Sequence, residues 1–157
     1  MLKRRVRSIL VALMALVALA VGIFAAVKVG KIEKTKDLGL TSYSVGSIAE
    51  ASGAEEKSAH AIRTGFLKAD KFNKITLGEN AEITYRVFYY NADKDFIGKT
   101  EVQSADLTEI AKTQTVEEAT ENVKYFRVVI IVPEAKDDVT VFNMNDYVKQ
   151  LTVTLNK

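Results

Sequence analysis

The side chains that could carry catalysis are few in this sequence. The chain contains one histidine, His60, and no cysteine, so a catalytic triad or a histidine-based metal site would depend on that single residue. His60 follows a polar stretch, and no serine near it lies in a Gly-x-Ser-x-Gly motif. The sequence also has no glycine-rich phosphate loop and no metalloprotease motif. We therefore expect that the protein is not an enzyme and uses no cofactor.

One stretch begins like a calcium-binding loop. Asn91, Asp93 and Asp95 have the spacing with which an EF-hand loop starts. The pattern then fails, because Phe96 stands where glycine is needed and Val102 where a bidentate glutamate is needed. The stretch therefore predicts a hairpin turn, since Asn and Asp side chains bond their own backbone. A cation held by Asp93, Asp95 and a distant carboxylate is the alternative.

Arginine and tyrosine side chains make the stronger case for ligand binding. Arg127 lies in a largely apolar stretch, and a buried arginine requires a carboxylate or several carbonyl oxygens. Its guanidinium therefore either pairs with an acid from a loop or grips a ligand carboxylate or sugar hydroxyls. Tyrosines at alternating positions either stack on sugar rings or pack in the core and across strands. The candidate ligand-binding residues are Arg63, Tyr90, Tyr125 and Arg127.

Strands must position these residues. Residues 82–90 alternate strictly, with Ile83, Tyr85, Val87 and Tyr89 on one face. Residues 124–133 are nearly continuous in β-branched and aromatic side chains, which predicts a central strand covered on both faces and ended by the only proline, Pro133. Further short strands are predicted at 38–45, 61–68, 72–77, 96–98, 106–110, 139–142 and 151–155.

The segments between these strands are predicted to be loops and short helical turns. Residues 46–60 are small and polar and predict a long loop. Thr115–Glu118 has capping-box spacing and predicts the start of a short helix, and residues 143–149 predict a helical turn. With about eight short strands and no long amphipathic helix, we expect an all-β domain, an antiparallel, jelly-roll-like β-sandwich.

A transmembrane helix is predicted before this domain. The uncharged run Ile9–Val27 would be about 28 Å long as a helix, close to the thickness of the hydrocarbon core of a bilayer. A basic N-terminal flank places that end in the cytoplasm. We expect a cytoplasmic stub and signal-anchor at 1–28, with residues 8–27 in the membrane, a juxtamembrane linker at 29–37 and an extracytoplasmic β-sandwich at 38–157. Cleavage as a secretory signal, which would give a secreted protein, is the alternative.

Charge is distributed unevenly along the chain. Residues 1–36 hold eight of the 22 basic side chains and one of the 20 acidic ones, which leaves a net charge of −5 on the remainder. An acidic domain argues against nucleic acid as a partner. An exported domain without cysteine has no disulfides, which fits a bacterial cell surface better than a eukaryotic secretory route.

Three stretches carry a resemblance to a known kind of domain. They are Ile62–Phe66 (Ile-Arg-Thr-Gly-Phe), Tyr89–Gly98 (Tyr-Tyr-Asn-Ala-Asp-Lys-Asp-Phe-Ile-Gly) and Lys124–Ile130 (Lys-Tyr-Phe-Arg-Val-Val-Ile). Their order resembles a domain of surface, phage-tail and cell-wall-associated proteins of low-GC Gram-positive bacteria, which is similar to the galactose-binding-type jelly roll. The resemblance implies a jelly-roll fold and carbohydrate binding.

Together these features predict a membrane-anchored, extracytoplasmic binding module for a cell-surface glycan or a protein partner. The alternative is a structural subunit of an envelope assembly, in which Ala12, Ala15, Ala18 and Gly22 let the membrane helix approach other helices closely.

Overall fold

The structure is a computed structural model that describes residues 43–156. The predicted signal-anchor at 1–28, the linker at 29–37 and the start of the predicted 38–157 domain lie outside the described residues. Within residues 43–156, no helix has the length and apolar character that a membrane crossing requires.

The described chain is all-β, as predicted, with antiparallel strand pairs and little helix. Its main sheet has the order β1–β4–β11–β7–β8, with β5 also paired to β11. The strands of this sheet are β1 (Tyr43–Val45), β4 (Ala61–Thr64), β5 (Leu67–Lys68), β7 (Thr84–Tyr90), β8 (Phe96–Lys99) and β11 (Tyr125–Ile131). β11 pairs with β7 from Tyr125 opposite Tyr90 to Ile131 opposite Thr84, which confirms the predicted central strand.

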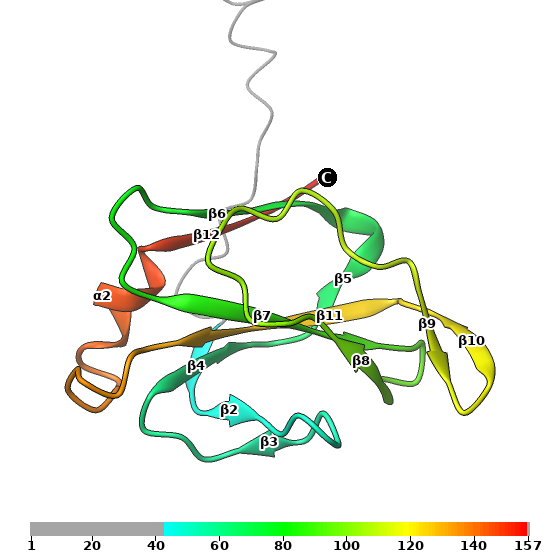
Figure 1. Ribbon diagram of the computed structural model, residues 1–157, viewed down its shortest axis with the longest axis horizontal. Coiled ribbons are helices and arrows are strands. Elements are labelled where there is room, and N and C mark those ends of the chain that lie inside the picture. Colours follow the sequence, from blue (N-terminus) through cyan, green and yellow to red (C-terminus); the bar gives the residue numbers. More distant parts are fainter. Residues whose placement is uncertain (1–42, 157) are drawn as a thin grey trace, which may run out of the picture. The chain divides into compact units, whose positions relative to one another are not determined.

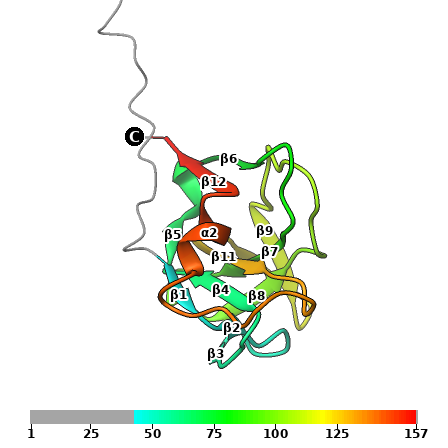
Figure 2. The ribbon, with the colours of Figure 1, turned by 90° about the vertical axis from the view of Figure 1, so that its left-hand side faces the viewer.

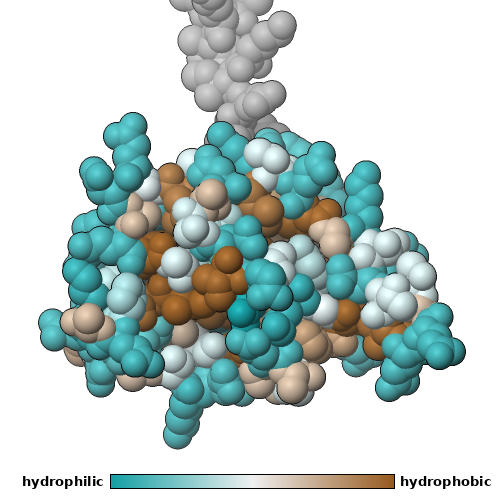
Figure 3. Space-filling model, in the orientation of Figure 1, coloured by the Kyte–Doolittle hydropathy of each residue, from teal (hydrophilic) through white to brown (hydrophobic). Residues whose placement is uncertain are grey.

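A smaller layer covers one face of the main sheet. It is formed by β6 (Phe72–Leu77) paired with β12 (Leu151–Leu155), and the short helix α2 (Met144–Val148) precedes β12. The larger apolar cluster lies between the two layers and includes Tyr85, Val87 and Phe126. Figure 1 shows β6 and β12 above the main sheet, and Figure 3 shows that, in the same view, apolar residues reach the surface mainly in the middle and upper part of the molecule.

The opposite face of the main sheet is covered by a hairpin within the segment that the sequence predicted as a long loop. β2 (Ser47–Ile48) pairs there with β3 (Glu55–Glu56). Ile48 packs on Phe88 and Tyr90 in a second, smaller apolar cluster. Both views place β2 and β3 on the side of the sheet away from β6 and β12 (Figures 1 and 2).

The helix predicted to start at Thr115–Glu118 is wrong. β9 (Thr113–Val116) and β10 (Ala119–Asn122) form a hairpin there, joined by Glu117 and Glu118. Both glutamates have positive φ, 48° and 70°, which is the geometry of a two-residue hairpin turn whose twist matches that of the strands. Glutamate is not typical of such turns, so the sequence did not indicate a hairpin, and the capping-box spacing led to the prediction of a helix.

The strand predicted at Val139–Phe142 is also wrong, because this segment is a turn leading into α2. The Thr140 N–H donates to the Asn143 side chain (2.7 Å), where a strand would require a partner on a neighbouring strand. The predicted helical turn at 143–149 is confirmed by α2, and the predicted strand at 151–155 by β12. Of the predicted strand at 106–110, Leu107 makes an isolated bridge to Ile75.

Candidate functional site

All four predicted ligand-binding residues lie on the face of the main sheet that carries the β2–β3 hairpin, and three of them gather around Phe66. Tyr125 lies opposite Tyr90 in the register of β11 and β7. Phe66 packs edge-on against both, at 4.9 Å from the Tyr90 ring and 6.1 Å from the Tyr125 ring. The guanidinium carbon of Arg127 lies 4.9 Å from the centre of the Phe66 ring. Phe66 therefore joins the predicted residues, although its own role was not predicted.

Arg127 is bonded within the protein. The side chain is 4% exposed, its Nη2 donates to Glu55 Oε1 (2.7 Å), and its Nε donates to the Thr64 carbonyl (2.8 Å). This is the structural pairing with a loop acid that the sequence allowed as one of two interpretations. Glu55 itself was missed, because nothing in the polar stretch distinguishes it from neighbouring acids.

Arg63, the fourth predicted residue, shares the same carboxylate. Its Nη2 donates to Glu55 Oε2 (2.9 Å) and its Nη1 to the Glu56 carbonyl (3.2 Å). Hydrogen bonding to Arg127, followed by the charges of Arg127 and Arg63, lowers the pKa of Glu55 despite the opposing effect of burial. Arg63 also lines a cavity of about 350 Å³ beside Gly46 and Lys57.

Tyr90 does not present its hydroxyl to a ligand. The residue is 2% exposed, and the hydroxyl donates to the Gly53 carbonyl in the β2–β3 turn (2.8 Å). Burial raises the pKa of Tyr90. The polar ends of Arg127 and Tyr90 thus fasten the hairpin to the sheet.

A second carboxylate of the hairpin segment fastens the same face. Glu50 pairs with Arg86 and, at 2.9 Å, with Lys99. Hydrogen bonds from Lys99 and Arg86 lower the pKa of Glu50. Two acids, Glu50 and Glu55, therefore neutralise four basic side chains on this face of the sheet: Arg63, Arg86, Lys99 and Arg127.

The predicted alternative cation ligands lie in the turn between β7 and β8. Asn91 Oδ1 accepts hydrogen bonds from the N–H groups of Asp93 (3.0 Å) and Asp95 (2.9 Å), so the stretch closes the predicted hairpin. Among residues 43–156, no group of three or more His, Cys, Asp or Glu side chains is placed to hold a metal ion. Lys94, between the two aspartates, reaches back over Phe66 and Tyr125, at 5.0 and 5.7 Å from their ring centres.

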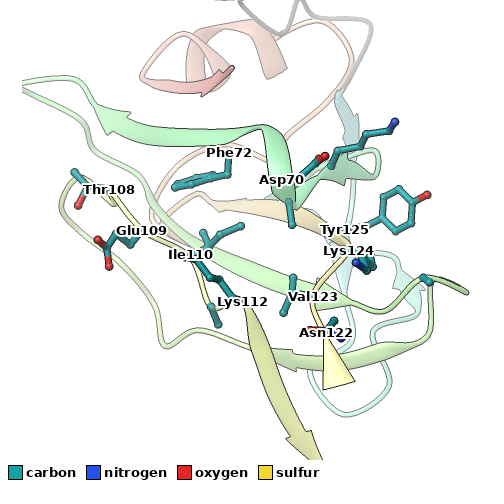
Figure 4. A pocket seen from close by; sticks show the side chains of 14 residues that line it. Asp70, Phe72, Thr108, Glu109, Ile110, Lys112, Asn122, Val123, Lys124 and Tyr125 are labelled. Carbon is teal, nitrogen blue, oxygen red and sulfur yellow. The ribbon is translucent and has the colours of Figure 1, made fainter. Parts of the chain in front are cut away.

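A second candidate ligand site is a cavity of about 740 Å³ at the end of the main sheet where β11 begins. It lies between the 3₁₀ turn η2 (Ala69–Lys71), residues 108–112, β10 and the start of β11 (Figure 4). Its apolar lining includes Phe72, Ile110 and Val123. Its charged lining residues are Lys68, Asp70, Glu109, Lys112 and Lys124.

Tyr125 is the predicted site residue that lines this cavity, and it contacts the Phe66 cluster as well. The other lining residues were not predicted, because they come from segments far apart in the sequence and none carries a motif. The cavity offers apolar surface beside ammonium and carboxylate groups, which is the composition of a binding site.

Comparison of the chain with models of protein families, with curated proteins and with solved structures finds no match.

Proposed function

We propose that the chain is a membrane-anchored, extracytoplasmic binding protein that captures a protein partner in the cavity between η2, residues 108–112 and the start of β11. The observation that carries the proposal is the cavity of about 740 Å³ itself, with its apolar lining and charged residues. The predicted arginine and tyrosine cluster supports the fold instead, because Glu55 and Gly53 occupy its polar groups.

The proposal includes the placement of the chain. Residues 8–27 hold the protein in the membrane, residues 29–37 are the linker, and residues 38–157 lie outside the cytoplasm. The supporting features are the uncharged run and the basic residues before it. For the described domain we propose a jelly-roll-like sandwich, which is supported by two antiparallel layers on a shared core and by the insertion of β11 between β4 and β7.

A protein partner fits the cavity better than a glycan. Phe72 and Ile110, both partly exposed, offer separate apolar contacts in the cavity, which suit the apolar side chains of a protein partner. The aromatic residues of the lining are Phe72 and Tyr125; Phe72 packs edge-on against Phe126 (5.5 Å), and the buried hydroxyl of Tyr90 is bonded to Gly53, so Tyr125 is left to stack on a sugar. A glycan is therefore one outcome that the test must be able to reveal.

Photo-crosslinking from the cavity rim tests the proposal. A photoreactive amino acid in place of Glu109 in the full chain, expressed in its own cells, should give a discrete adduct with a protein. Lys112→Glu should abolish the adduct by reversing one charge of the lining. The same amino acid at exposed Glu101, outside the lining, is the control. An adduct with polysaccharide would show that the ligand is a glycan and not a protein. The absence of any adduct above the level of the control would contradict the proposal.

A further inference from the structure

Two neighbouring apolar side chains project from the loop between β11 and α2. Phe142 is 94% exposed and Val141 is 73% exposed, whereas Val139 is buried and holds the base of the loop. Isolated apolar residues at a surface are ordinary, but two adjacent ones at the end of a loop form a compact knob that suits a complementary pocket. We call Val141 and Phe142 the apolar tip.

Hydrogen bonds fix the loop that carries the apolar tip. The Asn143 side chain accepts from the Thr140 N–H (2.7 Å) and donates to the Asp138 carbonyl (2.9 Å). The Phe142 N–H donates to the Thr140 hydroxyl (3.3 Å), and the Met144 N–H to the Thr140 carbonyl (2.9 Å). The tip is thus ordered before it meets a partner, which reduces the entropy lost on binding.

The charges beside the tip are complementary to those of the cavity. Asp137 and Asp138, both exposed, precede the tip in the same loop. The cavity lining contains three lysines against two acids, so its net charge is positive. The tip loop carries an excess of acids and the cavity an excess of one lysine, so the two apolar surfaces have opposite net charge, which favours one orientation of docking.

The tip of one molecule cannot enter its own cavity. The cavity lies where β11 begins, at Tyr125, and the tip loop follows the other end of the strand, beyond Ile131. This strand alone separates the two by about 20 Å. Figure 1 shows β9 and β10 at one end of the described domain and α2, with the loop before it, at the other.

From this arrangement we propose that the Val141–Phe142 tip of one copy docks in the cavity of a second copy, head to tail. The inference rests on the proposed function and names its partner as the chain itself. Because the tip and the cavity are different surfaces at opposite ends, the contact is heterologous, and repeating it gives a chain of copies that closes into a ring if the rotation between copies allows it and otherwise stays open. Anchoring in one membrane would raise the effective concentration of the copies and let a weak contact suffice.

Sedimentation of the full chain in detergent micelles over a range of concentrations tests for the assembly. The wild type should show mass rising with concentration, and Phe142→Ala should weaken the association at least tenfold. Val102→Ala is the matched control, because Val102 is also exposed but lies outside both surfaces. A wild type that stays monomeric up to about 100 μM, or a closed dimer that Phe142→Ala leaves intact, overturns the proposal.

Charge exchange tests the orientation. Asp137→Lys and Lys112→Glu should each weaken the association, and mixing the two variants should restore it, because every contact then joins opposite charges. The natural absence of cysteine adds a direct probe, since Val141→Cys copies mixed with Lys112→Cys copies should form a disulfide-linked heterodimer on oxidation. Glu101→Cys in place of Lys112→Cys should not. If Val141→Cys forms a disulfide equally well with Lys112→Cys and with Glu101→Cys, the proposed contact is contradicted.

These results separate the inference from the proposed function. A monomeric chain that still gives a Glu109 adduct with a different protein removes self-docking and leaves the cavity as a binding site. A monomeric chain with no adduct removes both.

Discussion

Glu55, in β3, links the β2–β3 hairpin to the main sheet through ion pairs with two arginines. One carboxylate, whose side chain is 55% exposed, neutralises both Arg63 and the nearly buried Arg127. Replacing it by glutamine leaves Arg127 buried without its counter-charge. We expect Glu55→Gln to lower the free energy of unfolding by about 1–2 kcal/mol, below the cost of breaking a fully buried pair because water reaches the carboxylate. Urea denaturation measures this, and exposed Glu56→Gln in the same strand should change it by less than about 0.5 kcal/mol.

The pH dependence of the same pair has a defined sign. Arg127 and Arg63 lower the pKa of Glu55 in the folded protein, so the unfolded chain takes up its proton first as the pH falls. The stabilisation is complete above the unfolded value of about 4.3 and is lost as the pH falls through the lower, folded value. The difference in stability between wild type and Glu55→Gln should therefore shrink steadily below about pH 4. A difference that stays constant down to pH 2 would show that the carboxylate charge plays no part.

Tyr85 should control stability at the alkaline end. Burial, with a smaller contribution from Asp106, raises its pKa to about 12, and its hydroxyl donates to the Ala105 carbonyl (2.8 Å). A raised pKa favours the neutral phenol in the folded state, so stability falls as the pH rises from about 10, the unfolded value, towards 12. Tyr85→Phe should cost about 1 kcal/mol at neutral pH and should remove this component of the alkaline loss. Denaturation curves at pH 8 and pH 11 compare the two; equal alkaline losses would contradict the assignment.

At the level of the element, the β2–β3 hairpin depends on one backbone position. Gly53 has φ of +66°, and an added methyl group there would overlap the Phe96 side chain. Its carbonyl also accepts the hydrogen bond from the buried Tyr90 hydroxyl. We expect Gly53→Ala to cost about 2–4 kcal/mol, from left-handed backbone strain together with overpacking. Gly65→Ala is the control, because no atom lies within 4 Å of the position its methyl group would take.

Hydrogen exchange should locate the effect of Gly53→Ala. The Gly53 N–H donates to the Ala49 carbonyl (2.8 Å), and the Ala49 N–H donates to the Ala54 carbonyl (2.8 Å). Both amides should exchange faster in the variant, while those of β11, in the centre of the sheet, keep most of their protection. Uniform acceleration across the sheet would show instead that the hairpin and the main sheet open as one unit.

The elements that could be predicted are those whose own side chains determine them. β7 and β11 follow from alternation and from β-branched content, because each strand buries at least one whole face. The β9–β10 hairpin could not be predicted, since its turn places two glutamates at positive φ and its strands bury little. The strand prediction at 139–142 failed for a related reason. Hydrogen bonds of the Asn143 side chain with the Thr140 N–H and the Asp138 carbonyl determine the backbone conformation there.

At the scale of the whole molecule, the candidate sites also include features that the sequence could predict and features that it could not. The need of Arg127 for a carboxylate could be read from its apolar neighbours, but the identity of Glu55, 72 residues away in the chain, depends on the tertiary fold. The cavity is still less local, because η2, residues 108–112, β10 and the start of β11 meet only after the sheet has formed. A sequence pattern reports what one segment buries, whereas a cavity is defined by what several segments leave unfilled.

The proposed placement of the molecule at the membrane gives the broadest prediction. Lys28, Lys31, Lys34 and Lys36 lie between the predicted span and the first described strand, and each is a site for trypsin. If the domain lies outside the cytoplasm, trypsin added to intact cells should remove the full-length chain and release a fragment that begins within this linker. The fragment should resist further cleavage, because lysines in strands such as Lys68 and Lys99 are held in a packed sheet.

Immunoblotting and mass spectrometry of the released N-terminus measure this, with a cytoplasmic protein as the control for lysis. Cleavage that requires broken cells would place the domain in the cytoplasm. A chain found in the medium before any protease is added, and beginning just after the small-x-small sequence Ala18-Leu19-Ala20, would establish the cleaved signal instead.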